Sequence, residues 1–308
     1  VAFLNSCRAR AKPRANSGIF LPPNNKTITA TTIKIVQLVA SAKNEIDNMF
    51  SILNYQLSIV NSQFKIELML RAFHKIPVPA EATTLTLNPD ESHHLVKVLR
   101  ANDHETICVF DGNGNFYHCH MLDHNAKALT LTIDKRESVP APRCEIALAQ
   151  AMPKGSLMDD VIRQVTEIGA TKIFPLMSDH CEVKLDPDRA AKKLERWQQI
   201  AIEACKQCGN AFVPEIVPVM TIREFLKNRS RDANALWLTA SLESGTRFCH
   251  EIAAEKNAFP PSEILWFVGP EGDFSENEYA LMREAGCVPA RLGRNILRAV
   301  TAAIYTLT

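Results

Sequence analysis

The chain has 308 residues, enough for two domains, and 46% of them are hydrophobic, which is enough to fill two cores. No apolar run reaches the roughly eighteen residues that a membrane-spanning helix needs, so we expect no membrane partner. The formal net charge of +1 carries no overall signature of nucleic-acid binding and leaves only a local basic patch open. Nine cysteines without regular spacing argue against a secreted disulfide framework and favour a reducing compartment such as the cytoplasm.

Residues 1–68 differ in composition from the rest of the chain. No acidic residue precedes Glu45, whereas the same stretch holds Arg8, Arg10, Lys12, Arg14, Lys26, Lys34 and Lys43. A basic leader without acids is typical of an organellar transit peptide, and the alternative is sequence translated from upstream of the true start. We favour the alternative and expect this leader to be disordered or non-native.

Between residues 69 and 138 the pattern predicts a small β-barrel-like domain. Short alternating segments bounded by turn residues predict strands over 83–87, 106–110, 115–121 and 128–133, with a hairpin turn at Asp111–Gly114. Ser92–Leu99 predicts a helix that Arg100 closes. His94, Lys97 and Arg100 lie on or beside this helix, where they can contact nucleic-acid phosphate, although a solvated helix face explains them equally well.

Two pairs of side chains have the spacing of metal or redox sites. His118 and His120 point to the same face of one strand, but no third ligand accompanies them, so we expect no metal. Cys205 and Cys208 form a Cys-x-x-Cys pair near the end of a predicted helix, where the helix dipole opposes a thiolate. We interpret both cysteines as residues that pack the helix.

Beyond a linker at 139–142, strands and helices alternate. Strands are predicted over 144–151, 171–176, 215–219, 235–238, 264–268 and 289–292, and helices over 156–167, 187–206 and 275–285. This order predicts an α/β domain over 143–308 with a largely parallel sheet covered on both faces.

The most informative segment is Ile264–Ser275, in which a buried strand runs into Gly-Pro-Glu-Gly. Ser275 and Glu278 then form a capping box that opens a helix, and Gly286 stands where a helix end favours a left-handed residue. Bare backbone N–H groups at the carboxyl end of a sheet are where α/β folds bind small ligands. A tight strand-to-helix connection without a ligand is the alternative for this turn alone.

A second segment twenty residues later adds weight to the first. Gly269–Ser275 and Leu292–Ala303 together resemble the closing half of SPOUT-class RNA methyltransferases. They are most similar to the bacterial family (RsmE type) that methylates N3 of a uridine in 16S ribosomal RNA. The similarity runs from Met69, which matches the family's opening, to the end of the chain, through Lys154–Asp159, Glu167–Ala170, Val183–Leu185 and Trp197–Gly209.

The resemblance implies a fold and partners that periodicity does not show. It implies an N-terminal PUA-like RNA-binding barrel followed by a SPOUT α/β methyltransferase domain with a C-terminal trefoil knot. It also implies S-adenosyl-L-methionine as cofactor, 16S ribosomal RNA in the assembled small subunit as substrate, and a homodimer.

Site residues follow from the same resemblance. Backbone of three loops would hold the methyl donor, through Leu238, Gly269, Glu271, Gly272, Leu292, Ile296, Leu297 and Arg298. We expect Arg298 to face the target nucleotide, either on RNA phosphate or on negative charge of the uracil. An ion pair that braces the knot, with Glu271 as its partner, explains Arg298 equally well, and Glu271 itself is either catalytic or a loop brace.

Three positions depart from the family pattern. Val300 replaces a Glu, Gln164 replaces a Lys, and His180 replaces an Arg. The chain also stops at Thr308, earlier than the family, so we expect a fragment. These departures motivate an alternative function, a catalytically weak or inactive RNA-binding ribosome-assembly factor. An unrelated nucleotide-binding enzyme is a third hypothesis, although no Gly-x-Gly-x-x-Gly or Gly-Lys-Ser/Thr motif supports it.

Overall fold

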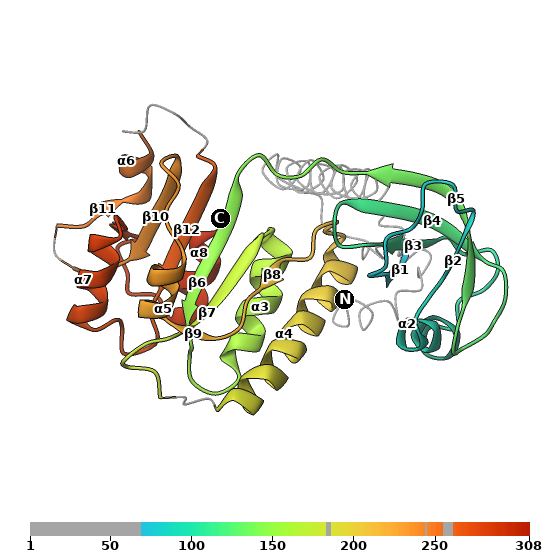
Figure 1. Ribbon diagram of the computed structural model, residues 1–308, viewed down its shortest axis with the longest axis horizontal. Coiled ribbons are helices and arrows are strands. Elements are labelled where there is room, and N and C mark those ends of the chain that lie inside the picture. The colour runs from blue at the N-terminus through green and yellow to red at the C-terminus, as the bar shows by residue number, and fades with distance from the viewer. Residues whose placement is uncertain (1–68, 183–185, 244, 255–260) are drawn as a thin grey trace, which may run out of the picture. The chain divides into compact units, whose positions relative to one another are not determined.

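The computed structural model describes residues 69–182, 186–243, 245–254 and 261–308 (Figure 1). The predicted leader, residues 1–68, and the motif Val183–Leu185 therefore lie outside the described residues.

The first domain is a five-stranded sheet built around one apolar core. Its strands are β1 (Leu70–Phe73), β2 (Thr84–Thr86), β3 (Ile107–Phe110), β4 (Asn115–Met121) and β5 (Thr130–Ser138), in the order β1-β3-β4-β5-β2. β1 is parallel to β3, and the other pairs are antiparallel. Along β4 every second side chain is buried, which is the alternation on which the strand prediction rested.

The helix predicted from Ser92 begins earlier, so its predicted start was wrong. α2 (Pro89–His93) is capped by Asn88, whose side chain accepts from Glu91 N at 2.9 Å. The chain continues as one wider π-helical turn, η1 (His94–Leu99), and ends at Arg100 with φ of 54°. Ser92 lies inside the helix and is buried, and its Oγ accepts from Leu129 N at 2.9 Å, which ties the helix to the barrel.

The second domain is one parallel sheet. Its elements are β6 (Glu145–Ala151), α3 (Leu157–Ile168), β7 (Lys172–Met177), α4 (Pro187–Cys208), β8 (Glu215–Ile216), β9 (Met220–Thr221), α5 (Ile222–Asn228), β10 (Ala235–Ala240), β11 (Arg247–Phe248), α6 (Cys249–Ala254), β12 (Glu263–Val268), α7 (Glu276–Glu284), β13 (Val288–Arg291) and α8 (Ala299–Thr306). The strand order is β11-β13-β10-β12-β6-β7-β8, and β9 also pairs with β7. The expected parallel sheet is therefore confirmed.

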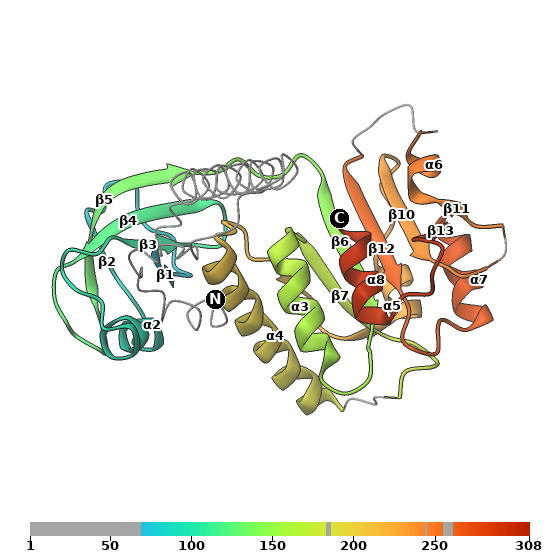
Figure 2. The same ribbon diagram turned by 180° about the vertical axis from the view of Figure 1, so that it is seen from behind.

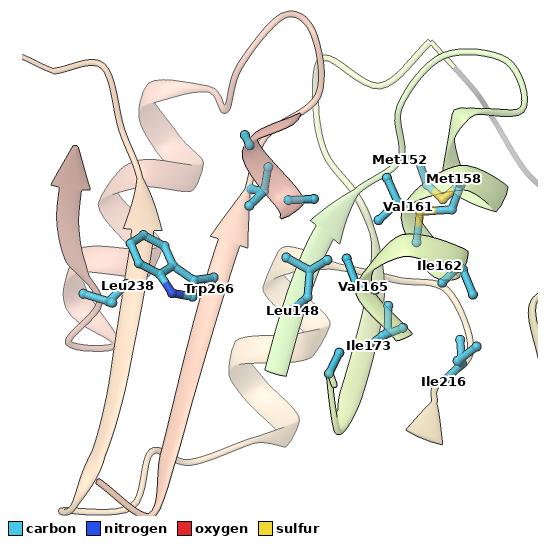
Figure 3. Packing of buried hydrophobic residues seen from close by; sticks show 14 of the residues in the cluster. Leu148, Met152, Met158, Val161, Ile162, Val165, Ile173, Ile216, Leu238 and Trp266 are labelled. Atoms are coloured by element: carbon cyan, nitrogen blue, oxygen red, sulfur yellow. The ribbon is translucent and has the colours of Figure 1, made fainter. Parts of the chain in front are cut away.

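Helices cover both faces of this sheet, as predicted. α3, α4 and α8 pack on one face and meet the apolar side chains of β6, β10 and β12 (Figure 2). Figure 3 shows Val165 of α3 beside Leu148 of β6 within this core. α5 and α7 cover the other face, where Phe225 packs edge-on against Phe174 and Phe267. After β13 the chain crosses back, since α8 packs against α3 and β12.

One buried carboxylate joins α3 to α4. Asp159 accepts from Trp197 Nε1 at 3.0 Å and from Arg196 Nε at 2.8 Å. Both Asp159 and Trp197 are buried, so the pair satisfies two polar groups that would otherwise be costly inside a core.

The two cysteines of the Cys-x-x-Cys pair have different surroundings. Cys205 is buried, and burial raises the pKa of its thiol to about 12, so it packs the helix as predicted. Cys208 is exposed, and its interpretation as a packing residue was wrong. It lies one residue before Gly209, where α4 ends and turns out of the core.

The barrel meets the end of α4 through buried polar contacts. Lys206 Nζ lies 3.0 Å from Glu91 Oε1, with side chains only 9% and 8% exposed. Arg71 donates to the carbonyls of Lys206 and Gln207, which satisfies the helix end. Gly209 has φ of 81°, and an added Cβ would lie 3.1 Å from the Arg71 guanidinium, so this position favours glycine twice over.

Replacing Lys206 by Met is expected to lower the free energy of unfolding by about 3–5 kcal/mol at pH 8 and by less at pH 5, because it leaves Glu91 buried without its cation. Burial already raises the pKa of Glu91 from its ordinary 4.5, and the Lys206 ammonium opposes the rise. Because the pKa of Glu91 is raised in the folded protein, stability falls as pH rises from 4.5 to the folded pKa. Losing Lys206 raises the folded pKa further, so the fall continues to higher pH.

Urea unfolding at the two pH values measures this effect. The double variant Lys206→Met/Glu91→Leu removes both charges and should recover most of the loss. Equal losses at pH 5 and pH 8 would contradict the account.

Candidate functional site

A cavity of about 750 Å³ opens at the carboxyl ends of β10, β12 and β13. Three loops form one side of it, and α3 with the start of α8 forms the other. Its lining residues include Ala240–Leu242, Val268–Glu271, Asp273, Arg291–Gly293 and Asn295–Ala302, together with Leu157, Asp160 and Gln164 of α3. A volume of this size suits a cofactor or drug-sized ligand.

The glycine-bearing loop after β12 is held from several directions. Asp273 has φ of 60°, unusual for a residue other than glycine, and its Oδ1 accepts from Phe274 N at 2.8 Å and Tyr279 Oη at 2.9 Å. Burial, and next the Asp273 carboxylate, raise the pKa of Tyr279, so its hydroxyl stays protonated and donates. The capping box predicted at Ser275 and Glu278 is confirmed, since both of its hydrogen bonds form.

Residues far away in the sequence brace the same loop. The Glu271 carboxylate accepts from Lys154 N at 3.2 Å and 3.3 Å, which is the loop-bracing contact that we had considered. The ring Nδ1 of His180 lies 3.0 Å from both Gly272 O and Asp273 O, as a donor to these carbonyls. These contacts fix the backbone whose N–H groups border the cavity.

Arg298 lies at the other side of the cavity mouth, as the residue that caps α8. Its side chain is exposed, and within the described residues no ion pair or hydrogen bond engages its guanidinium. The ion pair with Glu271, which was the alternative interpretation of Arg298, does not form, and the Glu271 carboxylate instead accepts from Lys154 N. Arg298 is thus available to a ligand in the cavity.

The structure brings together most of the cofactor residues that the family resemblance implied. Gly269, Glu271, Leu292, Ile296, Leu297 and Arg298 all line the cavity. Leu238 does not, because it is fully buried in the sheet core two residues before the lining begins at Ala240. Gly272 faces His180 instead, since an added Cβ would lie 3.2 Å from His180 Cβ.

Two departures from the family pattern lie on the same cavity. Gln164 and Val300 both line it, from α3 and α8. Gln164 Oε1 is buried and has no partner among the described residues. Val300 is half-buried and packs against the core. Their shared location was not visible in the sequence, where 136 positions separate them.

The three barrel residues predicted to bind RNA lie on η1 and at its end. Lys97 and Arg100 are exposed, whereas His94 is half-buried. Val98 and Leu99 beside them are exposed as well. Both an RNA contact and a solvated face remain compatible with this arrangement.

The two histidines on one face of β4 each pair with a carboxylate. His118 pairs with Glu137 at 3.4 Å and His120 with Asp134.

The sheet domain with its cavity and the barrel domain each match a family model of RNA methyltransferases. The family model for the RNA methyltransferase domain matches residues 140–308, and that for the RNA methyltransferase PUA domain matches residues 87–134. The predicted fold class, a PUA-like barrel followed by a SPOUT methyltransferase domain, is confirmed.

Curated relatives give the particular family. Ribosomal RNA small subunit methyltransferase E of Synechocystis is 33% identical over 73% of this chain and 71% of its own length, and that of Bacillus subtilis is 30% identical over 74% and 90%. A crystal structure of the Neisseria gonorrhoeae enzyme bound to S-adenosylmethionine is 31% identical, with a TM-score of 0.69 over 78% of this chain and 95% of that one. This chain belongs to the ribosomal RNA small subunit methyltransferase E family.

The cavity fits the cofactor that this family uses, S-adenosylmethionine. An added Cβ on Gly293 meets no heavy atom within 4 Å, so the glycine leaves open space at the cavity wall where a ligand can approach the backbone. The backbone of residues 269–271 and 291–298 and the apolar side chains of Leu242, Leu292 and Leu297 would hold it.

Proposed function

We propose that this chain transfers a methyl group from S-adenosylmethionine to N3 of a uridine in 16S ribosomal RNA, on the assembled small subunit. The observation that carries the proposal is the cavity, bounded by the braced backbone loop after β12 and by Arg298, whose guanidinium has no partner among the described residues. Family membership supports the enzyme over the assembly factor that Val300 suggested.

S-adenosylmethionine, when bound, supplies the methyl group of a sulfonium. The rest of the cofactor is then the leaving group, a neutral thioether. The protein's own contribution is orientation, because the bond-breaking chemistry belongs to the cofactor. The contacts of Glu271, His180 and Tyr279 hold the loop rigid before any ligand arrives. The N3 proton of the uridine must also leave, to solvent water at the open cavity mouth, and Arg298 would stabilise the negative charge that this leaves on the uracil.

We also propose that the chain forms a homodimer through the surface beside the cavity. Large apolar side chains are exposed there: Leu157 on α3 is 38% exposed, Ile296 is 79% exposed and Tyr305 on α8 is 53% exposed. Apolar side chains gathered in this way mark interaction surfaces.

In the part of the chain that the structure describes, no helix has the length and apolar character needed to cross a membrane.

Methyl transfer from labelled S-adenosylmethionine to small subunits that lack the N3-methyluridine mark tests the function. Label on one uridine supports the proposal, and its position is read by primer extension and nuclease mapping. Binding of the cofactor without transfer to any uridine would favour the assembly factor.

The chain with Val300 is expected to be active, and Val300→Glu is expected to change the transfer rate by less than about fivefold. A carboxylate in the first turn of α8 gains about 0.3–1 kcal/mol from the helix dipole, which offsets the lost packing of a half-buried Val. Rates of both proteins on the same subunits measure this. Transfer that occurs only with Glu at position 300 would mark the chain as damaged.

A further inference from the structure

Three arginines border the cavity mouth on one segment between β13 and α8. Arg291, Arg294 and Arg298 are all exposed, and Arg291 and Arg298 line the cavity. None of their guanidinium groups has an ion pair or a hydrogen bond with a described residue. The function proposed above uses Arg298 alone and leaves the other two without a role.

Several arginines elsewhere in this domain pair with nearby carboxylates. Arg163 pairs with Asp160, Arg189 with Asp186, Arg196 with Asp159 and Arg283 with Glu243. The first turn of α8 holds no acidic residue either. Three like charges within eight residues repel one another in the free protein, and a bound anion would relieve that repulsion.

The geometry of the segment favours an extended anion. Arg291 and Arg298 line the cavity and Arg294 does not, so two of the charges lie at the cavity wall and the third lies outside it. A small anion in the cavity would reach Arg291 and Arg298 and leave Arg294 free. A nucleic-acid backbone offers successive phosphates, and guanidinium groups bind phosphate through paired hydrogen bonds.

We propose that Arg291 and Arg294 bind backbone phosphates of the RNA strand that flanks the target uridine, while Arg298 faces the target nucleotide. The inference rests on the proposed function, since it takes ribosomal RNA as the ligand. It adds a second RNA contact to the chain, on the methyltransferase domain beside the cavity.

The salt dependence of RNA binding distinguishes the loss of a phosphate contact from other causes of reduced affinity. The probe is unmethylated small ribosomal subunits, and their affinity is measured by filter binding over a series of KCl concentrations. Each phosphate contact adds about 0.7–0.9 to the slope of log affinity against log salt. We therefore expect Arg291→Gln and Arg294→Gln each to reduce that slope by about this amount, with affinity falling about 5- to 20-fold near 0.15 M salt.

Arg189→Gln is the matched control, because Arg189 is exposed, lies on α4 and pairs with Asp186. It should leave the slope unchanged. The affinity of Arg294→Gln for S-adenosylmethionine should also match that of the unchanged protein, since Arg294 lies off the cavity lining. Slopes for Arg291→Gln and Arg294→Gln equal to that of the control would overturn the proposal.

The readout is binding, so it stays independent of methyl transfer. If the unchanged protein transfers methyl groups but the variants keep its salt slope, the enzyme stands and the phosphate contacts are wrong. If the variants reduce the slope but the unchanged protein transfers no methyl group, the phosphate contacts stand and the proposed function is wrong.

Discussion

Replacing Arg298 by Ala is expected to reduce the methyl-transfer rate by about 10²–10³-fold and to leave the dissociation constant for S-adenosylmethionine within about threefold. The loss is that of one preorganised group that stabilises developing charge. Cofactor affinity is retained because this segment offers mainly backbone to the cofactor. Thermal stability should not change, since the guanidinium engages no described residue.

Single-turnover rates with saturating cofactor measure this effect, alongside equilibrium binding and thermal unfolding. Arg298→Lys keeps the charge and loses the planar fork, and should recover only part of the rate. A lower melting temperature with an unchanged rate would restore the interpretation of Arg298 as a brace.

Replacing Gly293 by Val is expected to weaken S-adenosylmethionine binding by at least tenfold without lowering the stability of the protein. Gly293 lines the cavity and an added Cβ meets no protein atom within 4 Å, so the new side chain occupies space meant for the ligand. Its φ lies outside the left-handed region, which means that the backbone accepts a larger residue without strain.

Isothermal titration with the cofactor and thermal unfolding separate the two effects. Gly293→Ala adds one methyl group, and its affinity for S-adenosylmethionine should lie between those of the unchanged protein and Gly293→Val. Unchanged affinity in Gly293→Val would place the cofactor elsewhere in the cavity.

Local signals in the sequence predicted local structure well. The capping box at Ser275 and Glu278 formed as expected, and Gly286 has the predicted left-handed φ of 82°. The same signal, Thr221 with Glu224, opens α5 and was available in the sequence but not used. The start of α2 was missed because Asn88 and Pro89 cap it before Ser92.

The parts that could not be predicted depend on contacts between distant residues. Glu271 meets Lys154 across 117 positions, and His180 meets Gly272 across 92. The sequence pattern ended this strand at Leu238, whereas β10 continues beside β12 and β13 to Ala240, where the cavity lining begins. Strands as short as β9 and β11 carry no pattern long enough to recognise.

The strand order has a consequence for how the protein is made. β6, the first strand of the sheet to leave the ribosome, has β12 as one neighbour, and β13 inserts between β10 and β11 only afterwards. The cavity wall at 291–302 is synthesised after the lining segments of α3, β10 and β12. A nascent chain that stops before β13 therefore holds only part of the cavity lining, and we expect it to bind the cofactor weakly. Chains that stall before β13 would therefore compete poorly for the methyl donor.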